Sequence, residues 1–349
     1  MASERGSTPD NLPKKERVLR ALRREAVDRC PTQSNYTGAM GRLLSDHFRI
    51  AEAELPEHLG NHLLRVDIDH PRSTNTDGSI EFDWWGAGWD TRTEGYWHAS
   101  SPLKDSLDLD HYAWPNPNDA TILRTAERTI LRDRAKYFIV PNLGMCLFER
   151  AWSLRGFDLL LMDMVERTDW VEDLLDRIMQ VQVRLSMRFV AAGVDAGYFG
   201  DDYGAQHAML FSPRLWRRLI KPRLAKLFAV FVDAGLPVIL HSDGDIRAIL
   251  PDLVEIGLTT LNPVQPEVLE HAWLQRDYGS KLSFYGGVST QRVLPGGTVE
   301  EVRAATIACA RALAPERTGL LLGASHRMQS DIPPRNVEAM LDAFDEACY

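Results

Sequence analysis

The sequence lacks the marks of a secreted or membrane-spanning protein. It has four cysteines, and no two of them have CxxC spacing. No secretory signal pattern precedes the first predicted helix, so we expect the chain to work in reducing cytoplasm. No apolar run approaches the roughly 20 residues that a membrane-spanning helix needs. Even the stretch 157–164 is interrupted by Asp158 and Asp163.

An excess of positive charge is also absent, because the net charge is −9. Nucleic acids and anionic membranes select basic surfaces, so neither is an expected partner. Hydrophobic residues make up 44% of the chain and charged residues 26%, which is ordinary for a globular protein with a large core. The expected partner is therefore a small-molecule substrate.

Short apolar runs that end in polar or small residues recur along the chain. Six of them occupy 137–140, 196–199, 237–240, 259–261, 282–285 and 319–322. Apolar strands separated by helices are typical of a parallel sheet buried on both faces, and polar strand ends indicate the catalytic rim of a barrel. Weaker strands at 32–35 and 65–68 would complete eight. No GxGxxG follows an early strand, which argues against an open doubly wound sheet.

These patterns predict one (β/α)8 barrel over residues 14–349, preceded by a flexible tail at 1–13. Apolar spacing of three and four predicts helices at 170–192, 213–234, 246–256, 299–313 and 334–347.

An insertion at 73–114, between the second and third strands, carries five of the nine tryptophans. Its Asp-Gly and Gly turns predict a β-hairpin excursion. We expect it to cover the barrel mouth, with Trp84 and Trp85 as candidate contacts to a substrate ring. A hydrophobic lid that only packs on the barrel and a homodimer interface are the alternatives.

The strongest candidate site follows the fifth strand. His241 and Asp243 are two residues apart, so in an extended segment both side chains point the same way. Together with His326, from the loop after the last strand, they could bind zinc or another divalent ion. The alternative is a His-Asp pair that orients the imidazole for acid/base chemistry without a metal.

Two adjacent carboxylates, Asp201 and Asp202, follow the fourth strand. One of them is expected to cap the next helix. Asp202 is the candidate catalytic acid or base, and His241 and His326 are the other candidate catalytic residues. The candidate substrate-binding residues at other strand ends are Asn142, Tyr203, Gln265 and Arg292.

Several segments resemble the uroporphyrinogen decarboxylase superfamily. They are RVLRALRREAVDRCP at 17–31, GDDYGAQHAMLFSPRLW from Gly200, VILHSDGDI from Val238, LNPVQPE from Leu261, FYGGVSTQRVLPGGTVEEV from Phe284 and SHRMQSDIPPRNVEAM from Ser325. The last segment reproduces the family spacing of His, Met, Asp, Pro and Asn or His. The resemblance covers about residues 14–347.

The resemblance implies one of two chemistries, and the sequence departs from both. Decarboxylases of this family carry an arginine-rich R-Q-A-G-R-Y segment, where residues 32–37 here read TQSNYT. Without those cations a porphyrinogen with many carboxylates is not the expected substrate. Zinc-dependent methyltransferases of the family use His-x-Cys and a distal Cys. This chain has His241 and Asp243 at the first pair, and Ser325 and His326 in the distal region.

The leading hypothesis is an enzyme that transfers or removes a methyl group of a small molecule with the help of a divalent metal, and a corrinoid protein is a candidate partner. The runner-up is a metal-free decarboxylase, a lyase that acts on a small carboxylic acid. A non-catalytic binding barrel is the third hypothesis. It explains the polar strand ends poorly, because buried polar groups destabilise a fold unless they are used or solvated.

Overall fold

The structure is a computed structural model that describes residues 11–70, 72–95 and 97–347. It divides into two compact units. Unit 1 comprises the chain up to Leu64, Asp133–Phe138 and the chain from Thr259 onward, and unit 2 comprises Arg65–Arg132 and Ile139–Leu258. The single barrel from residue 14 therefore stays a prediction. Cys348 and positions 1–10 of the predicted tail lie outside the described residues.

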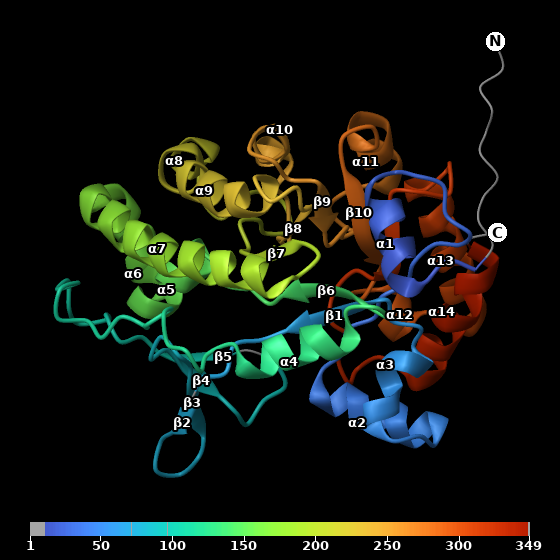
Figure 1. Cartoon of the computed structure of the whole chain (residues 1–349), viewed down its shortest axis with the longest axis horizontal. Coiled ribbons are helices and arrows are strands. Elements are labelled where there is room, and N and C mark those ends of the chain that lie inside the picture. The colour runs from blue at the N-terminus through green and yellow to red at the C-terminus, as the bar shows by residue number, and fades with distance from the viewer. Residues whose placement is uncertain (1–10, 71, 96, 348–349) are drawn as a thin grey trace. The chain divides into compact units, whose positions relative to one another are not determined.

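Parallel strands form the core of unit 1 (Figure 1). They are β9 (Thr260–Asn262), β10 (Ser283–Val288) and β11 (Leu320–Ala324), and all their residues are buried. Thr32, in the first predicted strand, makes only isolated parallel bridges, to Leu322 of β11 and to Asn61. Its segment lies very close to β11, since a Cβ at Gly323 would lie 1.9 Å from the carbonyl oxygen of Gln33.

Unit 2 also has parallel strands. β7 (Gly197–Gly200) and β8 (Val238–His241) are paired in register, with Gly200 opposite His241. β1 (Leu63–Val66) and β6 (Phe138–Pro141), which belong to unit 2 from Arg65 and from Ile139 onward, are partners too, and the amide of Asn142 donates to the carbonyl of Val66. Each strand lies within a few residues of its predicted position. The mixed α/β fold with parallel sheets is thus confirmed, whereas closure into an eight-stranded barrel stays a prediction.

Helices follow most of the parallel strands. In unit 1 they are α1 (Lys14–Leu22), α2 (Gly38–Phe48), η1 (Glu52–Glu54), α3 (Leu55–His58), α11 (His271–Tyr278), α12 (Val293–Gly296), α13 (Val299–Leu313) and α14 (Pro334–Ala347). In unit 2 they are α5 (Phe148–Arg155), α6 (Phe157–Glu166), α7 (Thr168–Ala192), α8 (Pro213–Leu219), α9 (Lys221–Val232), η2 (Arg247–Ile249) and α10 (Leu250–Glu255), and α4 (Arg124–Asp133) precedes β6. No helix of the described chain is long and apolar enough to span a membrane.

One predicted helix is wrong in its extent. The stretch 213–234 forms two helices, α8 and α9, that meet at Ile220. Pro222 lies in the first turn of α9. Proline has no amide hydrogen and its ring clashes with the preceding turn, so a continuous helix through this position is disfavoured.

The tryptophan-rich insertion forms an antiparallel sheet in unit 2. Its strands run in sequence order, β2 (Ser73–Thr74), β3 (Ile80–Phe82), β4 (Gly88–Asp90) and β5 (Trp97–Ser100). In the turn between β3 and β4, Trp85 is 4% exposed, and its ring lies edge-on to Trp114. The guanidinium of Arg150 in α5 lies 5.1 Å from the centre of the Trp85 ring.

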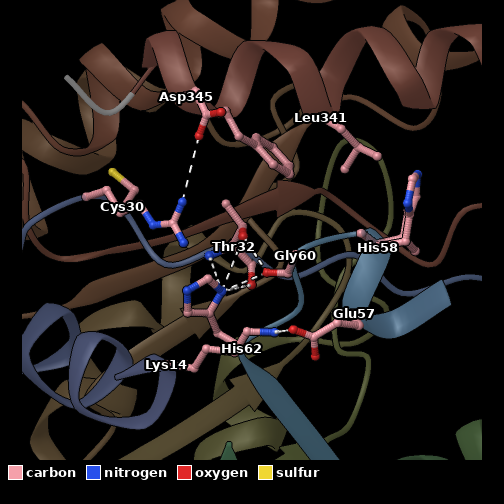
Figure 2. A pocket seen from close by; sticks show the side chains of 12 residues that line it. Lys14, Cys30, Thr32, Glu57, His58, Gly60, His62, Leu341 and Asp345 are labelled. Carbon is pink, nitrogen blue, oxygen red and sulfur yellow. Dashed lines mark hydrogen bonds and ion pairs between the residues drawn. The ribbon is translucent and has the colours of Figure 1, made fainter. Parts of the chain in front are cut away.

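Unit 1 contains a cavity of about 230 Å³, shown in Figure 2. His62, one of the lining residues, is 2% exposed and bonded on both ring nitrogens. Its Nδ1 lies 2.7 Å from the carbonyl oxygen of Gly60, and its Nε2 lies 2.9 Å from the guanidinium of Arg17. Because a guanidinium can only donate, Nε2 accepts and the ring is neutral. None of the candidate site residues lines this cavity.

We predict that acid destabilises the protein through His62. Burial lowers the pKa of His62 to about 4, with nearby Arg17, Lys14 and Arg29 acting in the same direction. Between pH 4 and about 6.5 the unfolded chain therefore binds a proton that the folded chain does not. The free energy of unfolding is expected to fall as the pH drops through this window, by at most about 3 kcal/mol. Urea unfolding at a series of pH values measures it. In a His62→Gln variant the free energy of unfolding should depend less steeply on pH in this window. Equal pH dependence in the variant and the wild-type protein would contradict the prediction.

Candidate active site

The loops after β7 and β8 are packed together through two glycines. A Cβ on Gly204 would lie 2.5 Å from the amide nitrogen of Asp245, and a Cβ on Gly244, whose φ is +79°, would lie 2.3 Å from the carbonyl carbon of Gly204. Only glycine allows such an approach. The amide of Asp245 also donates to the carbonyl of Ala205 at 2.8 Å. This contact fixes the two loops that carry the predicted polar pairs.

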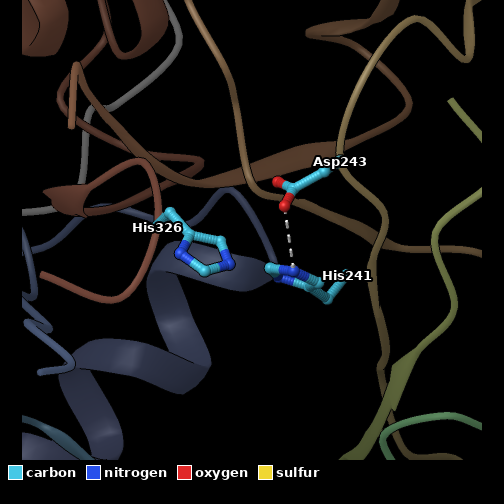
Figure 3. A group of neighbouring side chains, drawn as sticks. All are labelled: His241, Asp243 and His326. Carbon is cyan, nitrogen blue, oxygen red and sulfur yellow. Dashed lines mark ion pairs between the residues drawn. The ribbon is translucent and has the colours of Figure 1, made fainter. Parts of the chain in front are cut away.

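His241 lies between two carboxylates of unit 2. Its Nε2 is 3.9 Å from Oδ1 of Asp202 and 3.9 Å from Oδ2 of Asp243. The amide of Asp243 donates to Oδ1 of Asp202 at 2.9 Å, so the two loops hold each other in register. Figure 3 shows the side chains of His241 and Asp243, drawn with that of His326, and its dashed line marks the His241–Asp243 ion pair.

The Asp201 side chain makes different contacts from the Asp202 side chain. Its side chain is fully buried and accepts the amides of Phe148 and Glu149, at 2.8 and 2.7 Å, and the hydroxyl of Tyr203 at 2.7 Å. Its own amide donates to the carbonyl of His241 at 2.9 Å. Asp201 therefore caps α5, which precedes it in the chain. The expectation that one of the pair caps the next helix is wrong, because Ser212 caps α8.

The residues of unit 2 fit part of a zinc site. Imidazole nitrogen and carboxylate oxygen are both accepted zinc ligands, with bond lengths of about 2.0–2.2 Å. Two tetrahedral ligands at that length stand about 3.4 Å apart. The 3.9 Å between His241 Nε2 and Asp243 Oδ2 needs only a small side-chain adjustment to reach that value. His326 follows β11 in unit 1, as predicted for the loop after the last strand. Its place among the ligands stays a prediction.

The candidate substrate-binding residues have varied surroundings. Asn142 is exposed, and its amide group donates to Asp67 at 2.7 Å. Tyr203 is fully buried against Trp216. Gln265 in unit 1 is 6% exposed, and Arg292 is exposed beside α12. Substrate binding by these four residues, and by Trp84 and Trp85, stays a prediction.

Sequence reasoning missed Glu149 and Arg150 at the start of α5. Arg150 donates to Oδ2 of Asp83 at 2.6 Å, and Oδ1 of Asp83 accepts the amides of Trp85 and Ala87. This ion pair joins the tryptophan turn to α5. The sequence did carry a signal for them, because the adjacent charges of Glu149 and Arg150 interrupt an apolar run that follows a buried strand. The partner of Arg150 is 67 residues away in sequence, so it could not be named.

The parallel strands and the polar cluster after β7 and β8 define an α/β protein with a candidate site at the carboxyl ends of two strands. The family model of uroporphyrinogen decarboxylase (URO-D) matches residues 145–347, more than half of the chain. The protein therefore belongs to the uroporphyrinogen decarboxylase family, which confirms the resemblance seen in its segments.

Two solved structures illustrate what this chain is similar to. A methyltransferase from Methanosarcina mazei is similar with a TM-score of 0.72 and 21% identity, over 96% of this chain and 99% of that one. A B12-independent methionine synthase from a Shewanella species, in complex with selenomethionine, has a TM-score of 0.49 and 11% identity, over 87% of this chain and 86% of that one. No curated protein matches the sequence. At these identities the similarity to the Methanosarcina protein shows a shared fold.

Proposed function

We propose that this protein is an enzyme that transfers or removes a methyl group of a small molecule. The observation that carries the proposal is the cluster of His241, Asp243 and Asp202 at the ends of two adjacent strands. Membership of the uroporphyrinogen decarboxylase family and the fold shared with a methyltransferase support it. The small-molecule substrate and a corrinoid partner protein belong to the same proposal.

In this proposal His241, Asp243 and His326 hold a divalent metal, for which zinc is the best match to nitrogen and oxygen ligands. A bound zinc ion would supply Lewis acidity toward the heteroatom that carries the methyl group. Asp202 accepts the Asp243 amide and thereby orients the ligand loop. In this scheme Asp202 also donates or accepts a proton beside His241. The amide of Asp201 donates to the carbonyl of His241 and thereby fixes its backbone.

The metal content of protein purified without an affinity tag tests the proposal. We expect about one zinc ion per chain, and we expect methyl-group removal to stop when a chelator strips the metal and to return when zinc is restored. Methyl transfer from small methyl ethers and methylated amines to a thiol or a corrinoid would be assayed in parallel. Metal-free protein with undiminished activity would refute the metal scheme.

A metal-free decarboxylase of a small carboxylic acid is the second candidate. The description of the matching family favours it. Asp202 and His326 would then deliver the proton to the carbon atom that loses carbon dioxide. Release of carbon dioxide that persists in the presence of a chelator and in a His241→Ala variant would select this candidate over methyl transfer.

A further inference from the structure

The cavity of unit 1 has a buried base and a rim of charged residues (Figure 2). It lies beside the amino-terminal end of β1, because its lining residue His62 directly precedes that strand. It shares no lining residue with the cluster after β7 and β8, so the candidate active site does not account for it. The buried lining residues, none of them more than 8% exposed, are Cys30, Thr32, Leu59, His62 and Phe344.

The polar groups of Thr32 and His62 at the base are bonded to the protein itself. The Thr32 hydroxyl donates to the carbonyl oxygen of Gly60 at 2.7 Å, and Nδ1 of His62 donates to the same oxygen at 2.7 Å. Nε2 of His62 accepts from the Arg17 guanidinium. The lining residues beside them include leucines and a phenylalanine. Because polar groups that already have partners do not need a polar ligand, this end of the cavity favours an apolar group.

The rim has more positive than negative charge. Lys14 and Lys136 both pair with the Glu57 carboxylate, at 3.0 and 2.8 Å, so that carboxylate is already neutralised. Arg29 lies 3.8 Å from Oδ1 of Asp345, whose side chain is 78% exposed. A contact of that length is too long for a hydrogen bond, and an exposed ion pair of this kind is weak. With the histidines neutral, three cations thus face two carboxylates, and the Arg29 guanidinium can donate to a second carboxylate.

We propose that this cavity binds a small organic anion, with its one carboxylate on Arg29 and its apolar body against Leu59, Leu341 and Phe344. A guanidinium binds a carboxylate through two parallel hydrogen bonds, which fixes the orientation of the ligand. The volume of about 230 Å³ suits a molecule with a single ring or a short branched chain. The proposal goes beyond the proposed function and does not depend on the reaction of this protein.

Such a ligand would connect three helices that are far apart in the sequence. The lining residues come from α1, from α3 and from α14, as well as from the segment that leads to Thr32. A ligand that binds only the folded chain stabilises it in proportion to its occupancy. We therefore expect the bound anion to raise the temperature of unfolding and to slow amide hydrogen exchange in α1 and α14.

Calorimetric titration with benzoate tests the proposal. We expect one saturable site per chain, with a dissociation constant in the millimolar range or below. Benzamide has the same ring without the charge, and inorganic phosphate has charge without the ring, so both should bind more weakly. Arg29→Gln should weaken benzoate binding by about 10-fold or more, because a charged hydrogen-bonding partner is lost. Asp345→Asn removes the carboxylate that competes for Arg29 and should tighten binding by about two- to fivefold.

Arg311→Gln is the matched control, because Arg311 is an exposed arginine of α13 that does not line the cavity. It should bind benzoate as the wild-type protein does, and so should His241→Ala, which alters the candidate active site. Hydrogen exchange should show protection of α1 and α14 by benzoate in wild type and none in Arg29→Gln. The side chains of Arg29 and Asp345 are 43% and 78% exposed, so both variants should fold, which circular dichroism would verify.

Several outcomes would overturn the proposal. They are the absence of benzoate binding, equal binding of benzamide or phosphate, and equal affinity in Arg29→Gln and Arg311→Gln. Loss of binding in His241→Ala, with Arg29→Gln unaffected, would place benzoate at the candidate active site instead. None of these readouts uses methyl transfer, so failure of the proposed function would leave this inference standing, and the reverse also holds.

Discussion

A His241→Ala variant is expected to purify with almost no bound zinc and to lose methyl-transfer activity. His241 is the residue on which both carboxylate contacts of the unit 2 cluster converge. Loss of an outer-shell partner lowers metal affinity by about 10- to 100-fold, and loss of a direct ligand should exceed that. Metal content by mass spectrometry and zinc titration with a competing chelator measure the change.

A matched control separates this loss from the general effect of removing a histidine. His207 lies exposed in the loop after β7, so His207→Ala should retain wild-type zinc content. Asp202→Asn should fall between the two variants, since Asp202 touches His241 and the Asp243 amide without being a proposed ligand. Equal zinc content in the His241 and His207 variants would show that the metal, if bound, is held elsewhere.

Replacement of Trp85 with alanine should lower the free energy of unfolding by about 3 to 5 kcal/mol, the usual loss for a large buried aromatic side chain. Trp85 is 4% exposed, packs against Trp84 and Trp114, and lies beside the Arg150 guanidinium. The deletion removes these contacts and leaves a cavity next to a buried charge. Urea unfolding followed by circular dichroism measures the change.

Trp97→Ala is the control, because Trp97 belongs to the same sheet and is 63% exposed. Its effect should stay within about 0.5 kcal/mol. The half-buried Trp84 then gives the cleaner probe of the predicted lid, since its removal should alter substrate affinity with less loss of stability. Gel filtration of both variants distinguishes a lid from an interface. Dissociation into smaller species with unchanged substrate affinity would reject the lid.

Features set by local sequence were predictable. Parallel strands are marked by short apolar runs, and β7, β8 and β9 begin within one residue of the expected positions. The helices at 299–313 and 334–347 have the predicted ends. Thr298 and Glu301 form a capping box before the first of these helices, which fixes where it starts. The break at Ile220 could have been anticipated from Pro222.

Features that depend on distant partners were not predictable. In the sequence Asp201 and Asp202 are adjacent and cannot be told apart. Only the fold shows that Asp201 is buried against α5 and that Asp202 lies next to His241. The amide of Glu149 donates to the Asp201 carboxylate across 52 residues of sequence, and no spacing rule reveals that contact. Alternation of hydrophobicity says which residues are buried, but it does not say which of the buried charges meet.

The tryptophan-rich sheet is built from neighbours in sequence, so its strands form with short loops and little dependence on the parallel strands. It is fastened to α5 by the Asp83–Arg150 pair and by the contacts of Trp89 and His98 with Trp152. A segment of this kind can change in length or composition without shifting the register of β7 and β8, provided that these contacts with α5 are kept. Changes of length or composition in this sheet can therefore accumulate while Asp202, His241 and Asp243 keep their positions at the ends of β7 and β8.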